Sequence, residues 1–403
     1  MKFAASRLEP VKPSASAWVS QAAKEAKARG EDVIDLGLGE PDFDTPPHII
    51  AAAHQAALRG QTRYPPTNGT LEMRQAVVDK LVRENSLSYA VNEVIVSNGA
   101  KQVLFNAMMA TLEQDDEVLM CAPYFGQYKD IVLILGGQAV ALKCPAENGF
   151  RLSPEQLEAA ITSKTRWIML NLPSNPAGAV YTDDDLQALG AVLERHPDVL
   201  ILSDEIYEHI LFDGRTFRSF AAANPSFKDR TLTVNGVSKA YAMTGWRIGY
   251  GAGPKPLIAA MTKVQSQICS GACAIAQAAA AAALNGPQDA VRAFTKEFEA
   301  RRDLVVDRVA QIDGLTLDPP GGAFYGLIGC AGLIGAETEA GETLEDDAAI
   351  TGYILRDAGI AAVPGSAYEL SPFFRISTAA STGVLNHAMD RIAASVAKLK
   401  RKT

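Results

Sequence analysis

Between residues 93 and 236 the chain alternates short apolar runs with longer amphipathic segments, and this alternation restricts its fold more than any other feature. The runs EVIVS (93–97), RWIMLNL (166–172) and VLILSDE (199–205) have the length and composition of buried strands. Helical patterns, such as the one over 182–196, separate them. Continuously apolar strands that alternate with helices predict an α/β fold, in which helices cover both faces of a mostly parallel central sheet.

The length of the chain predicts a second, smaller domain. Its 403 residues exceed what one hydrophobic core usually fills. A charged helical pattern over 288–312 leads from the sheet region toward an α+β portion. We therefore predict an N-terminal arm with part of the small domain at 1–45, a large domain at 46–290 and a small C-terminal domain at 291–403.

Charge and composition argue against several classes of partner. The formal net charge of −8, without a basic cluster before the last few residues, argues against nucleic acid. No apolar run reaches the roughly 18 residues of a membrane span, and the N-terminus lacks the apolar core of a signal peptide. The five cysteines are scattered and lack the spacing of a zinc site. We expect a cytoplasmic protein without a metal or a membrane partner.

Polar and small residues gather where the predicted strands end. SNGAKQ (97–102), PSNPAG (173–178), SDEIYEH (203–209) and NGVSK (235–239) each follow an apolar run. Because ligands bind at the carboxyl ends of parallel strands, these segments are expected to converge on one site.

Each of these segments has both a functional and a structural interpretation. Gly99 and Ala100 could open a helix whose free N–H groups hold a phosphate, or could serve packing alone. Asp204, at the end of an apolar strand, needs a cationic or N–H partner, although it could be a capping residue beside a core Tyr207. Asn175 lies between two prolines and could face a ligand or occupy a turn.

The stretch NGVSKAYAMTGWRIGYGAGP (235–254) places Lys239 and Arg247 eight residues apart among small and apolar neighbours. A desolvated lysine amine loses part of its preference for the charged form, and a neutral amine can form a Schiff base with a carbonyl. Pyridoxal 5'-phosphate offers a chemical partner to every group named so far. Its aldehyde suits Lys239, its ring nitrogen Asp204, its phenolic oxygen Tyr207 and Asn175, and its phosphate Arg247 and the helix start at Gly99 and Ala100.

The sequence around Lys239 resembles that of a known family. GVSKAYAMTGWRIG (236–249) is similar throughout its length to the lysine signature of the class I pyridoxal-phosphate aminotransferases. The resemblance covers nearly the whole chain and includes GEPDFDTP (39–46), RYPPTNG (63–69), GGAFYG (321–326) and FFRIST (373–378). The most similar branch is the bacterial aspartate aminotransferases, a group that includes enzymes acting on prephenate. The resemblance implies the type I fold of pyridoxal-phosphate-dependent transferases.

The resemblance also implies roles in holding the cofactor. Lys239 would bind the cofactor aldehyde and carry the proton, Asp204 would pair with the ring nitrogen, and Tyr207 and Asn175 would bind the ring oxygen. The phosphate would be held by Arg247 and by the helix start at Gly99, Ala100 and Lys101. Tyr64 resembles a tyrosine that reaches the phosphate from the other subunit, which implies a homodimer with shared active sites.

For the substrate, the resemblance implies a two-pronged contact between Arg375 and the α-carboxylate, a geometry that lysine cannot reproduce. Gly39 would contact the substrate through its backbone, where a side chain would crowd the ligand. Lys101 is associated in this branch with the substrate's distal carboxylate, and the hydroxyls of Ser14 and Ser16 lie near it. Alternatively, Lys101 serves only to neutralise the phosphate.

One departure from the family pattern concerns the ring that stacks on the cofactor. These aminotransferases commonly read Pro-Tyr-Trp, whereas this chain has PYFGQY with Phe125. A phenyl ring presents less area and no N–H donor. The neighbouring Gly126 and Gln127 also differ from the pattern, which leaves the substrate range open.

The resemblance implies that the chain moves the amino group of aspartate, or of a related dicarboxylic amino acid, to 2-oxoglutarate by a ping-pong mechanism. Its partners would be small amino acids and 2-oxo acids. The alternatives are an aminotransferase for prephenate, aromatic or other amino acids, a β-lyase or cyclising synthase on the same fold, and a regulatory ligand sensor. The sensor lacks room for an output domain before residue 14.

Overall fold

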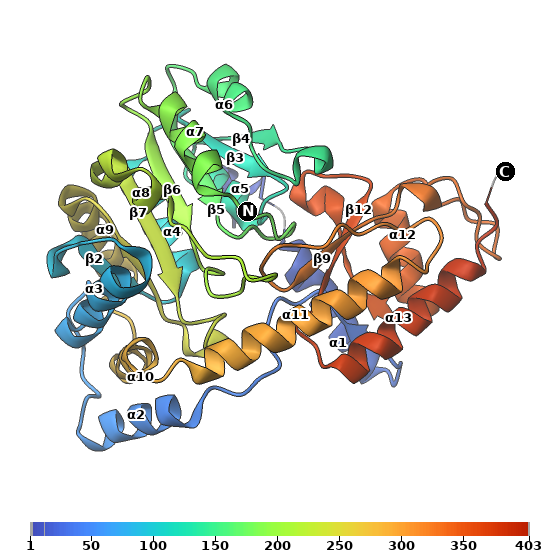
Figure 1. Cartoon of the computed structure of the whole chain (residues 1–403), viewed down its shortest axis with the longest axis horizontal. Coiled ribbons are helices and arrows are strands. Elements are labelled where there is room, and N and C mark those ends of the chain that lie inside the picture. Colours follow the sequence, from blue (N-terminus) through green and yellow to red (C-terminus); the bar gives the residue numbers. More distant parts are fainter. Residues whose placement is uncertain (1–2, 12, 402–403) are drawn as a thin grey trace.

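The larger part of the molecule is built around a seven-stranded sheet with the order β2-β8-β7-β6-β5-β3-β4. In this computed structural model, which describes residues 3–11 and 13–401, the sheet lies between layers of helices (Figure 1). Its strands are β2 (Val94–Ser97), β3 (Glu117–Ala122), β4 (Gln138–Lys143), β5 (Thr165–Asn171), β6 (Leu200–Asp204), β7 (Thr231–Gly236) and β8 (Gly249–Ala252). Neighbouring strands are parallel except β8, which is antiparallel to both β2 and β7. The predicted mostly parallel sheet is confirmed.

Side chains that alternate along the strands divide the core between the two faces of the sheet. Val118 and Met120 of β3 pack with α4 (Ala100–Thr111), α5 (Gln127–Ile134) and α9 (Lys255–Ile268). Leu119, between them in sequence, packs on the other side with α6 (Pro154–Ala160), α7 (Asp183–Leu193) and α8 (Phe220–Ala223). This period of two is the pattern of a strand buried on both faces. A third group of helices covers β2 and β8, namely α2 (Pro47–Leu58), α3 (Leu71–Asn85) and α10 (Ala274–Asn285).

A second body with its own hydrophobic core combines residues from both ends of the chain, and we call it the C-terminal body. It contains a three-stranded antiparallel sheet of β11 (Val363–Pro364), β12 (Phe373–Ser377) and β9 (Tyr325–Gly329). N-terminal β1 (Ile34–Asp35) pairs in parallel with β10 (Ile360–Ala361). Its helices are α1 (Ala15–Ala28), α12 (Asp347–Tyr353) and α13 (Thr382–Ala397). The domain boundaries at 45/46 and 290/291 stay a prediction.

The long helix α11 (Asp289–Val309) runs from the sheet region into the C-terminal body (Figure 1). Two neighbouring buried arginines hold it. Arg301 Nη1 lies 2.7 Å from Asp42 Oδ1 and also donates to a backbone carbonyl. Arg302 Nη2 lies 2.7 Å from Asp213 Oδ1, and its Nη1 donates to the carbonyl of Pro320. The helix is therefore fixed at this point to segments of both bodies, because Asp213 lies in the larger part and the carbonyl bound by Arg301 is that of Ala379, just after β12.

None of the described helices is both long enough and apolar enough to span a membrane.

Candidate active site

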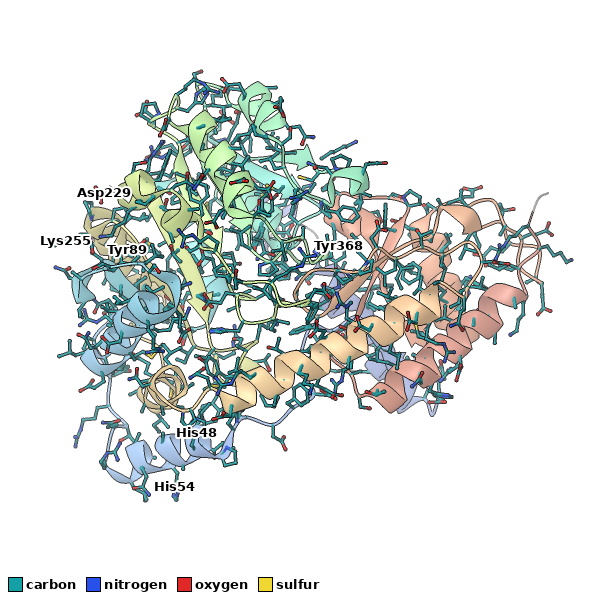
Figure 2. All side chains as sticks on the ribbon, viewed as in Figure 1. His48, His54, Tyr89, Asp229, Lys255 and Tyr368 are labelled. Carbon is teal, nitrogen blue, oxygen red and sulfur yellow. The ribbon has the colours of Figure 1, made fainter. Side chains whose placement is uncertain are left out.

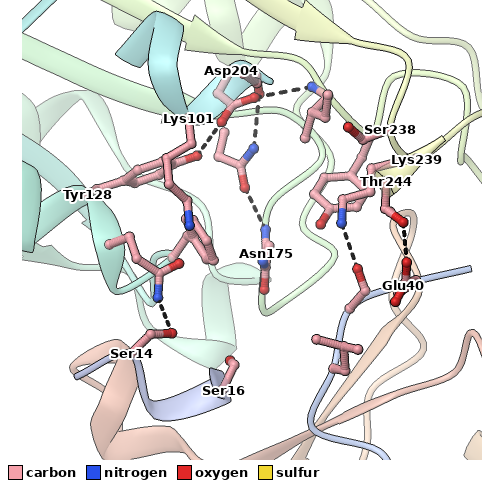
Figure 3. A pocket seen from close by; sticks show the side chains of 18 of the residues that line it. Ser14, Ser16, Glu40, Lys101, Tyr128, Asn175, Asp204, Ser238, Lys239 and Thr244 are labelled. Carbon is pink, nitrogen blue, oxygen red and sulfur yellow. Dashed lines mark hydrogen bonds between the residues drawn. The ribbon is translucent and has the colours of Figure 1, made fainter. Parts of the chain in front are cut away.

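The strand-end residues converge on one cavity of about 430 Å³, which also takes side chains from α1 and β12 (Figure 3). All the site residues predicted from the sequence line it except Gly99 and Tyr64. Those that line it are Ser14, Ser16, Gly39, Ala100, Lys101, Phe125, Asn175, Asp204, Tyr207, Lys239, Arg247 and Arg375. The cavity therefore lies where the larger part of the molecule, built around the seven-stranded sheet, meets the C-terminal body.

Lys239 follows the C-terminal end of β7 and projects into this cavity (Figure 3). Its Nζ donates a hydrogen bond to the Gly39 carbonyl at 2.6 Å. Burial lowers the pKa of Lys239 to about 8, and the positive charge of Arg375 contributes in the same direction. The carboxylate of Glu40 opposes this shift, and it accepts a hydrogen bond from Thr244. A substantial fraction of the amine is therefore neutral and nucleophilic near neutral pH.

Asp204 ends β6 and is buried at the base of the cavity. Tyr128 Oη donates to its Oδ2 at 2.6 Å, and the Ile206 N–H donates to its Oδ1 at 3.3 Å. Burial raises the pKa of Asp204 to about 6, and these hydrogen bonds limit the rise. Asp204 forms no ion pair with a side chain in the described part of the chain, so a protonated ring nitrogen would supply the cationic partner that a buried carboxylate needs.

Two buried residues on the loops after β5 and β6 complete the middle of the cavity. Tyr207 Oη lies 2.8 Å from Tyr325 Oη. Asn175 Oδ1 accepts from Arg375 Nη1 at 3.1 Å, and its backbone N–H donates to Asn171 Oδ1 at 2.7 Å. The hydroxyl and the amide are therefore held in place by neighbours before any ligand binds.

An anion cradle is formed where α4 begins. Gly99, with φ of 83°, turns the chain from β2 into α4, and a side chain at this position would overlap the Arg247 guanidinium. The first N–H groups of the helix, on Ala100 and Lys101, have no acceptor within the helix. Burial lowers the pKa of Lys101, and the charge of Arg247 adds to that effect. A helix N-terminus beside two cations is a site that suits phosphate.

Arg375 of β12 provides a second candidate anion site in the same cavity. Its side chain is 1% exposed and lies between the rings of Tyr325 and Tyr368, which are 4.4 and 5.2 Å from its guanidinium carbon. Figure 2 places Tyr368 where the two bodies meet. Arg375 Nη2 donates to the Gly37 carbonyl and, at 3.3 Å, to Ser16 Oγ. No described carboxylate pairs with this guanidinium, and its buried Nε lacks a partner, so the site suits a carboxylate ligand.

The far end of the cavity holds the residues predicted to contact a substrate side chain. Ser14 caps α1, and its Oγ accepts a hydrogen bond from Gln127 Nε2 at 2.6 Å. Lys101 Nζ lies 5.4 Å from the centre of the Phe125 ring. Lys101, Ser14 and Phe125 thus line the same cavity, and their contact with a substrate stays a prediction.

Gly39 is constrained by its surroundings. A Cβ at this position would overlap the Tyr325 hydroxyl. Because the Gly39 carbonyl also accepts from Lys239, the backbone itself forms the wall of the cavity here.

Tyr64 is the predicted residue that this chain alone does not bring to the site. Its side chain is 91% exposed and does not line the cavity. Its predicted contact with the phosphate therefore depends on a second subunit.

Sequence reasoning missed several residues of the site. Tyr128, Tyr325, Glu40 and Thr244 line the cavity, and the first two hydrogen-bond to Asp204 and to Tyr207. Tyr128 lies in the first turn of α5, away from any strand end, and so gave no positional signal. Tyr325 lies within the quoted segment GGAFYG, but only the fold brings it against Tyr207.

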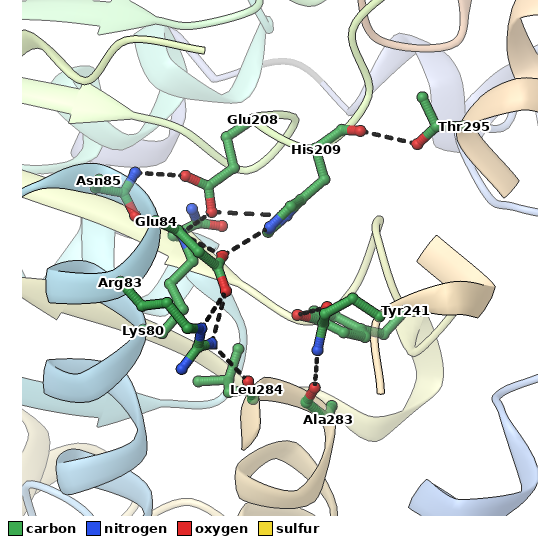
Figure 4. A network of polar contacts seen from close by, with 12 residues as sticks. Lys80, Arg83, Glu84, Asn85, Glu208, His209, Tyr241, Ala283, Leu284 and Thr295 are labelled. Atoms are coloured by element: carbon green, nitrogen blue, oxygen red, sulfur yellow. Dashed lines mark hydrogen bonds and ion pairs between the residues drawn. The ribbon is translucent and has the colours of Figure 1, made fainter. Parts of the chain in front are cut away.

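A second buried polar cluster lies outside the cavity, around Lys80 of α3 (Figure 4). Lys80 pairs with Glu208 and donates to Asn85 Oδ1 at 2.6 Å, while Glu84 Oε2 lies 3.5 Å from its Nζ. His209 Nε2 lies 3.0 Å from Glu84 Oε2. The two glutamates and the histidine are close enough to hold a metal ion, but the Lys80 ammonium already supplies the positive charge between the carboxylates.

Comparison with known proteins agrees with this arrangement. The family model for aminotransferase class I and II matches residues 31–392. An aspartate aminotransferase of Rhizobium meliloti strain 1021 is 52% identical over 98% of this chain and 96% of its own length. An aspartate/prephenate aminotransferase of Cereibacter sphaeroides is 49% identical over 99% of this chain and 100% of its own length.

The fold agrees as well. The crystal structure of the aspartate aminotransferase from Rhizobium meliloti superimposes with a TM-score of 0.97 at 51% identity, over 99% of this chain and 100% of that one. The buried lysine, the carboxylate at the end of β6 and the two anion sites therefore belong to an enzyme, and the chain is a member of the class I and II aminotransferases.

Proposed function

We propose that this chain transfers the amino group of aspartate to 2-oxoglutarate by a ping-pong mechanism. The observation that carries the proposal is the position of Lys239, a neutralisable amine in one cavity with two separate anion sites, the α4 cradle and Arg375. One anion site suits a cofactor phosphate and the other an amino acid carboxylate.

The cofactor is pyridoxal 5'-phosphate, which when bound supplies an aldehyde carbon and a ring able to take up the electron pair of a broken bond. The donor set fits it. Asp204 is a buried carboxylate that forms no ion pair with a described residue, and it suits the ring nitrogen. Tyr207 and Asn175 suit the ring oxygen, and Phe125 the ring face. The phosphate would take the α4 N-terminus and Arg247.

Lys239 would then act as the base. With a pKa of about 8, roughly a tenth of its amine is neutral at pH 7. A neutral amine can accept the proton from the substrate's Cα and return it at a second position, as general acid–base catalysis requires. Arg375 would hold the α-carboxylate through its fork, so that the Cα–H bond stays within reach of Nζ.

The proposed preference for a dicarboxylic substrate rests on the far end of the cavity. Lys101 supplies a positive charge there, and Ser14 and Ser16 supply hydroxyls. The names of the relatives from Rhizobium and Cereibacter support aspartate as the substrate. Prephenate is a second candidate because the Cereibacter relative is named for it as well.

We also propose a homodimer, because the exposed Tyr64 reaches a cofactor phosphate only from a second subunit. The predicted domain boundaries are retained in this proposal. A cytoplasmic location is proposed because all five cysteines are free, which suits a reducing compartment.

The test is an absorbance titration of the purified protein loaded with pyridoxal 5'-phosphate. Adding aspartate without an oxo acid should convert the spectrum of lysine-bound cofactor to that of its amine form, and 2-oxoglutarate should reverse the change. Glutamate, phenylalanine and alanine serve as comparison donors, and prephenate as an alternative acceptor.

The outcomes separate the competing functions. A spectrum that responds to phenylalanine but not to aspartate would replace the dicarboxylic substrate by an aromatic one. If a cysteine thioether, which carries a leaving group on Cβ, is added as a further donor, release of its thiol with ammonia and pyruvate in the absence of an oxo acid would indicate a β-lyase. Restoration by prephenate but not by 2-oxoglutarate would favour the second candidate.

A further inference from the structure

Two side chains of the first turn of α5, Gln127 and Lys129, contact the C-terminal body, and Gln127 also faces the cavity. Gln127, the first residue of α5, lines the cavity and donates to Ser14 Oγ. Lys129, two residues later, pairs with Glu369 at 2.6 Å on the surface, where their side chains are 42% and 38% exposed. Tyr128, which lies between them in the sequence, is buried and donates a hydrogen bond to Asp204. The turn that positions Gln127 is thus anchored to the base of the site.

The hydrogen bond from Gln127 restricts what the Ser14 hydroxyl can do. A serine hydroxyl offers one O–H donor and two acceptor positions. Ser14 Oγ accepts from Gln127 Nε2 at 2.6 Å and from the Ala17 N–H at 3.4 Å. Both acceptor positions are therefore in use. Its own O–H makes no hydrogen bond to the described residues and is left to donate into the cavity.

We propose that Gln127 is a positioning residue for substrate selection: it holds the Ser14 hydroxyl as a hydrogen-bond donor toward the distal carboxylate of a dicarboxylic substrate. The inference rests on the proposed function and deepens it. A carboxylate only accepts hydrogen bonds, so a hydroxyl fixed as a donor favours it, and Lys101 adds the matching charge in the same cavity. A neutral substrate side chain gains nothing from this arrangement.

The decisive variant is Gln127→Met, which removes the donor and keeps a side chain of similar length. The matched control is Lys129→Met, which removes the other contact of the same helical turn with the C-terminal body. Ser14→Ala and the double variant Ser14→Ala/Gln127→Met complete a cycle. Two quantities are measured on the loaded enzyme. They are the dissociation constant of succinate, a dicarboxylate that cannot react, and the single-turnover rates of amino transfer from aspartate and alanine.

We expect Gln127→Met to weaken succinate binding and to lower the apparent affinity for aspartate roughly threefold to tenfold, the size of one lost hydrogen bond. Transfer from alanine should change less than about twofold. Lys129→Met should leave both ligands unaffected, because exposed pairs contribute little. The double variant should bind succinate no more weakly than Ser14→Ala, because Gln127 acts only through Ser14.

Equal losses for aspartate and alanine in Gln127→Met, or full additivity with Ser14→Ala, would overturn the inference. Its failure can be told apart from that of the proposed function. A wild-type enzyme that binds no succinate and ignores aspartate would overturn the proposed function itself. A wild-type enzyme that prefers aspartate, and keeps that preference in Gln127→Met, would overturn the role of Gln127 alone.

Discussion

Two lysines, both enclosed by the larger part of the molecule, show how differently a fold can treat the same side chain. Lys80 is 0% exposed and is matched by Glu208, Glu84 and Asn85 (Figure 4). Lys239 borders the cavity, and within the described residues its amine has only a backbone carbonyl as a hydrogen-bond partner (Figure 3). The fold compensates the positive charge of Lys80, whereas it disfavours the positive charge of Lys239. Charge compensation stabilises structure, and its omission leaves an amine ready to react.

The carboxylates repeat this contrast. Burial alone would raise the pKa of Glu208, but Lys80 and His209 bring it below its ordinary value. Burial raises the pKa of Asp204 to about 6, because the hydrogen bonds from Tyr128 and Ile206 and the more distant charge of Lys239 offset only part of the cost of burial. The negative charge of Glu208 is thus compensated by neighbouring side chains of the protein. That of Asp204 is compensated only in part, and a cationic ligand group could pair with it.

Among substitutions that remove one of these charged groups, the largest expected effect is a loss of activity. Lys239→Ala should lower the transamination rate at least a thousandfold, because it removes the proposed base and the amine that binds the cofactor. Steady-state assays with aspartate and 2-oxoglutarate measure this effect, and circular dichroism checks that the variant is folded. A folded variant with normal turnover would refute the proposed mechanism.

The corresponding change at Lys80 should act on stability. Lys80→Met leaves Glu208 buried without its main counter-charge, and we expect the free energy of unfolding to fall by about 3 to 5 kcal/mol. Chemical denaturation measures the loss. The double variant Lys80→Met/Glu208→Leu should recover part of it, because no uncompensated charge then remains at that pair.

Lys239→Met sharpens the comparison because its effect on stability should have the opposite sign. In the cofactor-free protein the pKa of Lys239 falls from 10.5 to about 8, so folding below pH 8 must hold an unfavourable charge. Between pH 8 and 10.5 the unfolded chain binds a proton that the folded chain does not, and this group's contribution to stability rises with pH. Lys239→Met should therefore stabilise the protein by about 2 kcal/mol at pH 7 and by less at pH 10. A variant that is less stable than wild type at pH 7 would contradict this.

Tyr128→Phe tests the carboxylate side of the comparison. It removes the hydrogen bond to Asp204 Oδ2, worth about 1.5 to 3 kcal/mol to a charged group. The pKa of Asp204 should then rise above about 6, and the acid limb of the pH–rate profile should move to higher pH. An unchanged acid limb would show that Asp204 does not control it.

The comparison also explains what the sequence could predict. Apolar runs reveal buried strands because burial is a property of each segment, so β2, β5 and β6 were predicted together with the residues at their ends. The strand β8 has the sequence GYGA, which carries no apolar run, and its antiparallel place between β2 and β7 follows only from tertiary pairing.

Within the site, Lys239 and Asp204 were predictable because a charged residue beside an apolar strand is unusual. Tyr128 and Gln127 were not predictable as contacts. Their roles depend on where α5 lies relative to β6 and α1, which local sequence does not encode. The Lys80 cluster likewise joins residues separated by more than a hundred positions.

Because the arginine pair holds α11 at one point along its length, a rotation about that point would move both ends of the helix. At about 1.5 Å per residue the helix is about 30 Å long, and Arg301 and Arg302 fix it beyond its midpoint to the segments that carry Asp42 and Asp213. A tilt of the helix by about 5° around these two arginines would move either end by about 1 to 2 Å. Such a displacement separates a formed hydrogen bond from a broken one. A small rotation of α11, a helix that does not line the cavity, would therefore be large enough to disturb the contacts at its two ends.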